Sequence, residues 1–282
     1  MIKIVTDADA SLPEAEMDRY DITTIPLWVH FGEETYREGI DLTADEFYAR
    51  LTASKALPTT SQPSAGQFVE IYRPLLEAGH EIVSIHLSGD LSGTCLSAHQ
   101  AIEMLGGDVP ISVVDSRTVS VAEALLVRQA ALWAEAGRDR KTIAADLERV
   151  TDRVTVFFTV ETLEYLAKGG RIGKAAALMG TVLRVQPILS IQGGIIVPVE
   201  RPRTRRRAVA RLRELVLERT GENQEVWMGI AHARCLDEAE ALAQFFRETL
   251  SPAFLFIHEL GPGIGTHGGP GTLGVALYHP AE

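Results

Sequence analysis

The stretch Ile82-Val83-Ser84-Ile85-His86-Leu87-Ser88-Gly89-Asp90-Leu91-Ser92-Gly93-Thr94 decides the fold class. Its first five residues are rich in β-branched side chains, which is typical of a strand. A polar loop with glycines follows, and then a helical segment near Leu96–Leu105. In sheets of alternating strands and helices, ligands bind beyond the carboxyl ends of strands, where loops lead into helices. The loop around Ser92 is therefore a candidate binding site.

Strand and helix signals alternate through residues 1–150, the first expected domain. The expected strands are Ile2–Val5, Ile25–Phe31, Ile82–His86 and Ile111–Val114. The expected helices are Ala44–Ala53, Ala65–Ala78, Leu96–Leu105 and Val119–Gly137. Such alternation predicts a mostly parallel sheet with helices on both faces. Met1–Asp7 fits the first strand better than a signal peptide, since it has no long apolar segment.

Residues 151–282 predict a second, mixed α/β domain, and the 282 residues of the chain suit two domains. The expected strands are Val154–Thr159, Ile188–Ile191, Ile195–Val199, Val226–Ala231, Phe254–His258 and Leu273–Tyr278. The expected helices are Glu161–Ala167, Lys174–Leu183, an arginine-rich helix after Arg201, and Leu236–Leu250. Gln192-Gly193-Gly194 has the glycines of a hairpin turn. The sequence predicts a two-lobed α/β protein with its ligand between the lobes.

Composition excludes several classes of protein. Hydrophobic residues make up 46% of the chain and no apolar run approaches the ~18 residues of a membrane span. Two cysteines, Cys95 and Cys235, give neither a disulfide framework nor metal-ligand spacing, so we expect no metal and a cytoplasmic location. The net charge of −11 argues against nucleic-acid binding.

Two glycine-rich segments, Leu91–Thr94 and Gly265–Gly271, are expected to be loops, and each surrounds a polar residue. Glycines allow a ligand to approach the backbone closely. Ser92 and His267 could bind a carboxylate, or they could be the nucleophile and base of a hydrolase with Asp115 as the orienting acid. Ser92 is one residue out of register for the G-x-S-x-G nucleophile motif, which favours binding. Both residues could also be structural, as a helix cap and a packed histidine.

The sequence contains no convincing nucleotide-binding motif. Gly263–Gly268 matches G-x-G-x-x-G, but only 14 residues (282 − 268) follow it, too few for a dinucleotide-binding unit. No P-loop occurs, so we expect no cofactor. Thr59–Ser64 contains four hydroxyl residues before a helix. Ser64 suits a helix cap, whereas Thr60 and Ser61 could present hydroxyls to an anion.

Seven arginines lie between residues 201 and 213 of this otherwise acidic chain. They could form a solvated helix face or a docking patch for an acidic protein or a phosphate, and the pattern does not choose between these.

The motifs, in their order, resemble the DegV family over nearly the whole chain. The matching segments are Ile4–Asp7, Gly39–Leu42, Thr60–Ser64, Leu91–Thr94, Val114–Ser116, Leu163–Ile172, Gln186–Leu189, Arg203–Arg205 and Gly265–Gly271. Each segment is weak alone, but nine in the correct order are specific. The chain departs from the family pattern at Asp7-Ala8-Asp9-Ala10-Ser11, at Ser88-Gly89, at Cys95 and at Val121-Ala122-Glu123-Ala124, where a carboxylate replaces glycine.

The resemblance implies a protein that encloses one long-chain fatty acid in an apolar tunnel and is not itself an enzyme. It implies that the carboxylate lies near Thr60, Ser61, Ser92, Gly93 and His267. A separate fatty acid kinase subunit would convert the bound acid to an acyl phosphate, and Arg171 and Arg203 match the positions of partner contact. Transient membrane contact is compatible with such a cargo. The alternatives are a serine hydrolase or acyltransferase using Ser92 and His267, and a carrier of another lipid or isoprenoid carboxylate without a kinase partner.

Overall fold

The computed structural model describes residues 1–282 except 55, 180–184, 222–224 and 281–282. Its first sheet is parallel, with the strand order β2-β1-β6-β7. The strands are β2 (Thr23–Ile25), β1 (Ile2–Asp7), β6 (Glu81–His86) and β7 (Ile111–Asp115). A mostly apolar strand such as β6, with all of Ile82–His86 buried, can be stable only when helices cover both faces of its sheet.

The second sheet has six strands and is mixed: β11 and β12 are parallel and the other neighbours are antiparallel. In spatial order the strands are β10 (Ile195–Glu200), β9 (Ile188–Gln192), β8 (Thr155–Thr159), β13 (Leu273–Tyr278), β11 (Trp227–His232) and β12 (Phe254–Glu259). The predicted fold class, a parallel sheet combined with a mixed α/β unit, is confirmed. The hairpin at Gly193-Gly194 is confirmed too, with both glycines at positive φ.

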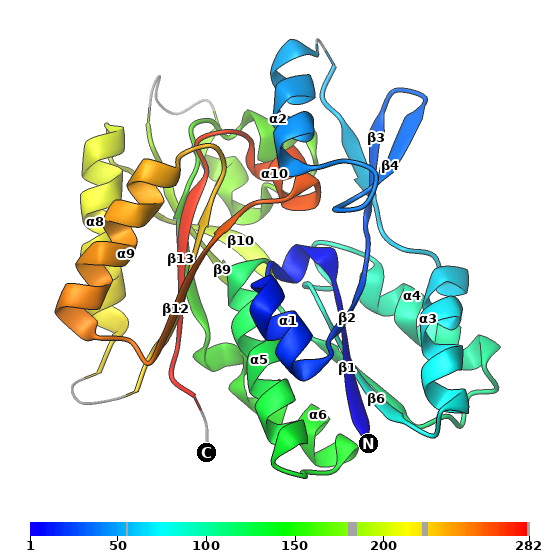
Figure 1. Cartoon of the computed structure of the whole chain (residues 1–282). Coiled ribbons are helices and arrows are strands. Elements are labelled where there is room, and N and C mark those ends of the chain that lie inside the picture. Colours follow the sequence, from blue (N-terminus) through cyan, green and yellow to red (C-terminus); the bar gives the residue numbers. More distant parts are fainter. Residues whose placement is uncertain (55, 180–184, 222–224, 281–282) are drawn as a thin grey trace.

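The described helices pack in layers around these sheets (Figure 1). They are α1 (Glu14–Tyr20), α2 (Ala44–Ala53), α3 (Ala65–Glu77), α4 (Thr94–Met104), α5 (Val121–Glu135), α6 (Arg140–Val150), α7 (Glu164–Lys168), α8 (Arg205–Arg219), α9 (Leu236–Leu250) and α10 (Pro262–Gly268), with short 3₁₀ helices η1 (Ala8–Ala10), η2 (Thr151–Arg153) and η3 (Gly173–Leu178). Helices α8 and α9 cover the outer face of the six-stranded sheet. Helix α5 lies between the two sheets, where Val83, Leu125 and Tyr278 belong to one buried cluster.

The structure corrects three local predictions. The strand expected at Ile25–Phe31 is divided at Pro26, which has no N–H to donate to a sheet. Its second part is β3 (Trp28–Phe31), which joins β4 (Glu34–Arg37) and β5 (Thr59–Ser61) in a small antiparallel sheet. The helix expected at Lys174–Leu183 is the 3₁₀ helix η3, and residues 180–184 lie outside the described part.

The glycine-rich segment around His267 is the third correction. It was expected to be a loop, but Pro262–Gly268 forms helix α10. Two features favour this helix. Pro262, at the first helical position, has its φ angle fixed near the helical value, and the Glu38 carboxylate accepts the N–H of Gly263 at 2.8 Å. Gly265 is required by close packing, because a methyl group there would overlap the rings of Phe47 and Tyr48.

Candidate ligand-binding site

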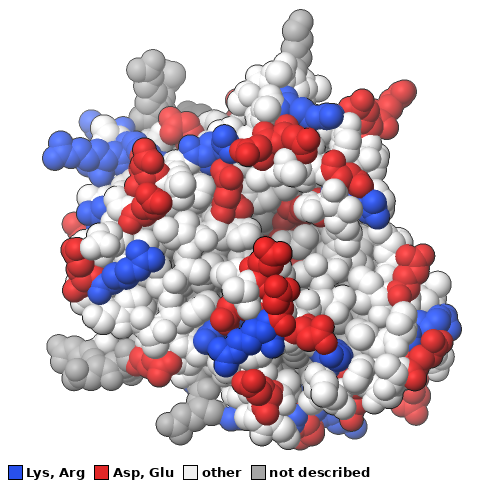
Figure 2. All heavy atoms as spheres, in the orientation of Figure 1, with Lys and Arg blue, Asp and Glu red and all other residues white. Residues whose placement is uncertain are grey.

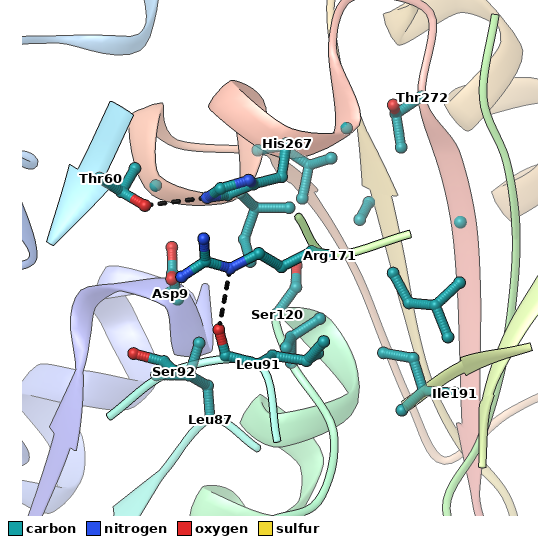
Figure 3. A pocket seen from close by; sticks show the side chains of 18 of the residues that line it. Asp9, Thr60, Leu87, Leu91, Ser92, Ser120, Arg171, Ile191, His267 and Thr272 are labelled. Carbon is teal, nitrogen blue, oxygen red and sulfur yellow. Dashed lines mark hydrogen bonds between the residues drawn. The ribbon is translucent and has the colours of Figure 1, made fainter. Parts of the chain in front are cut away.

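One deep pocket lies between the two large sheets, beyond the carboxyl ends of the strands of the parallel sheet (Figure 3). The empty space in and around it, including the part that is open to solvent, is about 960 Å³. Much of its wall is apolar and comes from the six-stranded sheet, from loops that follow strands of the parallel sheet, and from α5, α7 and α10. The apolar side chains are Leu27, Leu87, Leu91, Val119, Val121, Val156, Phe158, Leu166, Ile191, Ile196, Ala231, Leu260 and Ile264.

Polar side chains from three distant segments meet on this pocket. Thr60 and Ser61 come from β5, Ser92 from the loop before α4, and His267 from α10. Thr60 Oγ1 and His267 Nε2 are 2.8 Å apart and share a hydrogen bond (Figure 3). The Ser92 and Thr94 hydroxyls are 2.9 Å apart.

Gly93 does not line the deep pocket, but it explains how two of these segments come together. A methyl group at this position would collide with the Gln62 side-chain amide, about 2.5 Å away. The glycine therefore lets the Ser92 loop lie directly against the segment that follows β5. Ser64, three residues after Ser61, caps α3 by accepting the N–H of Gln67, so its predicted structural role is confirmed.

Arg171 lies deeper than the sequence suggested. It is partly buried and lines the pocket, and Figure 3 shows its side chain extending below the His267 ring. Its guanidinium donates to the carbonyl oxygens of Leu91, at 3.1 Å, and Gly169, at 2.7 Å. A positive charge is thus fixed beside the Ser92 loop, in a position to attract an anion.

His267 is neutral near physiological pH. Burial, together with the nearby positive charge of Arg171, lowers the pKa of His267 to about 4. Its Nδ1 is buried and has no hydrogen-bond partner among the described residues. That nitrogen faces Gly169, where a methyl group would overlap the imidazole ring. Gly169 is therefore a site residue that the sequence motif contained but that sequence reasoning did not single out.

The catalytic triad of the hydrolase alternative is not assembled. His267 pairs with Thr60 rather than Ser92, and no carboxylate of a described residue orients its Nδ1. Asp115 instead accepts the backbone N–H groups of Gly89, at 3.2 Å, and Arg117, at 2.8 Å. A nucleophile needs a base within hydrogen-bond reach and a group that orients the base, and among the described residues the Ser92 hydroxyl is bonded only to that of Thr94.

A shallow depression on the outer surface lies next to the polar side of the pocket. Leu91, Ser92 and Arg171 line both the deep pocket and a shallow outer depression, which also includes Gly93 and Gly170. A polar group bound beside Ser92 would therefore lie close to the outer surface.

Arg203 lies elsewhere, in the exposed segment before α8. Among the seven neighbouring arginines, Arg205 pairs with Glu238, Arg211 with three glutamates, and Arg213 lies over the Phe245 ring. The other four are exposed: Arg201, Arg203, Arg206 and Arg207. Figure 2 shows basic side chains gathered over the N-terminal end of α8. Some arginines of this segment therefore bind neighbouring side chains of the protein, and the others form a basic surface.

The described part of the chain offers no group of three or more His, Cys, Asp or Glu side chains that could hold a metal. None of its helices combines the length and apolar character needed to cross a bilayer.

Comparison with known proteins identifies the family. The family model described as "Uncharacterised protein, DegV family" matches residues 1–279. The chain belongs to the DegV family. It is 39% identical, over 98% of both chains, to a DegV domain-containing protein of Halalkalibacterium halodurans. Two solved structures agree in fold. The DegV family protein of Thermus thermophilus, described with fatty acid binding, has TM-score 0.93, 32% identity and coverage of 99% of both chains. A stearic-acid-binding protein of Eubacterium ventriosum has TM-score 0.91, 28% identity and the same coverage.

Proposed function

We propose that this DegV protein binds one long-chain fatty acid in the deep pocket, between its two lobes, and presents the carboxylate at the surface. The observation that carries the proposal is the distribution of polarity: a largely apolar pocket has Thr60, Ser92, Arg171 and His267 on its wall, and Ser92 and Arg171 also line the outer depression. The fatty-acid-binding members of the family support the same ligand class. A fatty acid has the matching distribution, one charged end on an apolar chain.

The polar residues suit an ionised carboxylate. Burying the anion unpaired would cost several kcal/mol, so it needs donors. In the tautomer with a proton on Nε2, His267 donates to Thr60, which leaves the Thr60 hydroxyl free to donate to a ligand oxygen. Ser92 offers a second hydroxyl, and Arg171 supplies positive charge. Ser61 is already bonded to His30 at 2.8 Å, so we assign it to support of the pocket wall.

We further propose that a separate kinase subunit phosphorylates the presented carboxylate. The chain supplies no P-loop of its own, and the shallow depression beside Ser92 gives a second protein access to the carboxylate end. The exposed arginines before α8, including Arg203, would attract an acidic partner surface. We also propose that the protein is cytoplasmic and contacts membranes only transiently.

Arg203→Ala is expected to weaken kinase-dependent acyl phosphate formation while leaving fatty acid affinity within about twofold, because an exposed charge acts mainly on association rate and salt dependence. Arg171→Ala should reduce both activities, since Arg171 also lines the pocket. The measurement is acyl phosphate formation with an added fatty acid kinase subunit, beside calorimetric titration of the acid. Loss of fatty acid binding in Arg203→Ala would contradict this division of roles.

Ester hydrolysis separates this function from the hydrolase alternative. The purified wild-type protein is expected to hydrolyse p-nitrophenyl acyl esters no faster than buffer, because Ser92 has no base in reach. Ser92→Ala and His267→Ala should change fatty acid affinity without changing that background rate. A robust wild-type rate that disappears in both variants would establish the hydrolase and reject the binding protein.

A further inference from the structure

A second depression, here called the polar depression, lies between the loop that follows β7 and one end of the six-stranded sheet. The loop contributes Arg117 and Thr118. Strand β9 contributes Ser190, and helix α8 contributes its last residue, Arg219. Among the described residues, Ile191 alone lines both the polar depression and the deep pocket, so the two are separate. The proposed function uses none of the polar side chains in this second depression.

Two positive charges in the polar depression have no carboxylate partner. Arg117 and Arg219 are exposed, and neither guanidinium group forms an ion pair with a described residue. Asp152 also lines the depression, at an exposed position, but neither arginine bonds to it. In a chain with a net charge of −11, these two guanidinium groups form a local positive region that is available to an anion from solution.

The side chain of Arg117 extends over the turn of the β9–β10 hairpin. Its backbone has φ +52, which is uncommon for a residue other than glycine, and its N–H donates to the Asp115 carboxylate at 2.8 Å. The Nη2 atom of Arg117 lies 3.5 Å from the position that a methyl group on Gly193 would take. The turn is held nearby, because the Ser88 hydroxyl donates to the carbonyl of Gly194 at 2.8 Å. The guanidinium group is therefore directed along the depression.

Two buried hydroxyl groups line the polar depression without a hydrogen-bond partner. Ser190 is 3% exposed and Thr118 is 6% exposed. Neither hydroxyl bonds to another described residue. Gln192 lies on the same face of β9 as Ser190, because side chains alternate along a strand, and its exposed amide adds another donor. A buried hydroxyl without a partner costs free energy, so a ligand that accepts hydrogen bonds here would remove that cost.

A phosphate group matches this set of donors. Guanidinium groups pair with phosphate through two parallel N–H···O bonds, and the several oxygens of phosphate can accept from hydroxyl groups at the same time. A carboxylate has two oxygens, which two guanidinium groups would already occupy. Two positive charges also balance the charge of a phosphate dianion.

We propose that Arg117, Arg219, Ser190 and Thr118 form a binding site for phosphate, either as the free ion or as the phosphate group of a small monoester. The inference goes beyond the proposed function and does not depend on it, since the two sites have different walls. Arg117 belongs to a loop of the parallel sheet and Arg219 to a helix that covers the six-stranded sheet. A bound phosphate would therefore connect the two parts of the molecule.

The test is an amide chemical-shift titration of the ¹⁵N-labelled protein with inorganic phosphate at neutral pH and constant ionic strength. Saturable shifts are expected at the amides of Thr118, Ser190 and Gln192. The titration is repeated with hexadecanoate present, and the same shifts are expected, because the deep pocket and the polar depression are separate. The result is thus independent of whether the fatty acid binds.

Three variants decide which groups hold the ion. Arg117→Gln and Arg219→Gln should each weaken phosphate binding by about ten- to a hundredfold, the range for a hydrogen bond to a charged group. Arg73, an exposed arginine on α3 without an ion-pair partner among the described residues, provides the matched control. Arg73→Gln removes the same charge elsewhere and should bind phosphate like the wild type.

Methyl phosphate, titrated in the same way, distinguishes the two sources of the phosphate group. Binding of both probes supports a site for monoesters, whereas binding of inorganic phosphate alone supports a site for the free ion.

The location of the wild-type shifts can contradict the inference without any variant. Absence of saturable shifts at Thr118 and Ser190 would overturn it. Shifts confined to Ser92 and Gly93 would overturn it as well, because phosphate would then bind beside the outer depression. Shifts at the expected amides that persist at wild-type affinity in both Arg117→Gln and Arg219→Gln would show that the arginines do not form the site.

Discussion

Affinity for saturated fatty acids is expected to rise about fourfold with each added methylene group until the pocket is full. Each buried CH₂ contributes roughly 0.8 kcal/mol, and about 1.4 kcal/mol is a factor of ten in affinity. From eight to sixteen carbons the summed effect far exceeds that of any single polar contact. Thr60, Ser92, Arg171 and His267 should therefore fix the orientation of the ligand more than its affinity.

Calorimetry with acids of eight to eighteen carbons, each below its aggregation concentration, measures this dependence. A matched series of fatty alcohols is the control: it should show the same slope with chain length at a constant loss of affinity, because only the charged group is removed. Equal affinity for the eight- and sixteen-carbon acids would exclude an acyl tunnel.

Gly169→Ala is expected to weaken carboxylate binding by about ten- to a hundredfold, which is the range of roughly 1.5–3 kcal/mol for a hydrogen bond to a charged group. The added methyl group would overlap the His267 ring and must displace it from Thr60. The affinity for a fatty alcohol should change much less, because the apolar wall is untouched.

Gly66→Ala on α3 is the matched control for this substitution. A methyl group at Gly66 meets its nearest neighbour, Ser64 Oγ, at 3.8 Å, which is ordinary contact. This variant should bind fatty acids like the wild type. Wild-type affinity in Gly169→Ala would show that the position of His267 does not matter for capture.

Local patterns along the sequence predicted most elements of the fold. The strand Ile82–His86 and the loop after it, the cap at Ser64, and helices Ala44–Ala53 and Leu236–Leu250 all follow from hydrophobic periodicity, turn residues and capping, which act over a few positions. These signals also place Ser92 just before a helix, but they do not predict strand β5, in which Thr60 lies. Membership in the DegV family required the order of nine motifs rather than any one of them.

Properties that depend on distant contacts could not be predicted in the same way. Helix α10 is rich in glycine and has poor intrinsic helix propensity. Two residues more than 200 positions earlier stabilise its start: Glu38 accepts the N–H of Gly263, and the Tyr48 hydroxyl donates to the carbonyl of Leu260, just before the helix. The lowered pKa of His267 comes from burial and from Arg171, which the sequence placed at a partner surface. Asp9 departs from the family pattern, but only the structure shows that it faces Glu38.

Native mass spectrometry of the freshly purified protein tests the central claim most directly. The wild type should carry one non-covalent ligand whose mass is that of a long-chain fatty acid. In Ala231→Phe the larger side chain would occupy part of the pocket, so the bound mass should disappear or become that of a shorter acid. Ala241→Phe, at an exposed position on α9, is the control and should retain the wild-type ligand. Wild-type protein without any bound mass, and without a mass shift after incubation with hexadecanoate, would contradict the account.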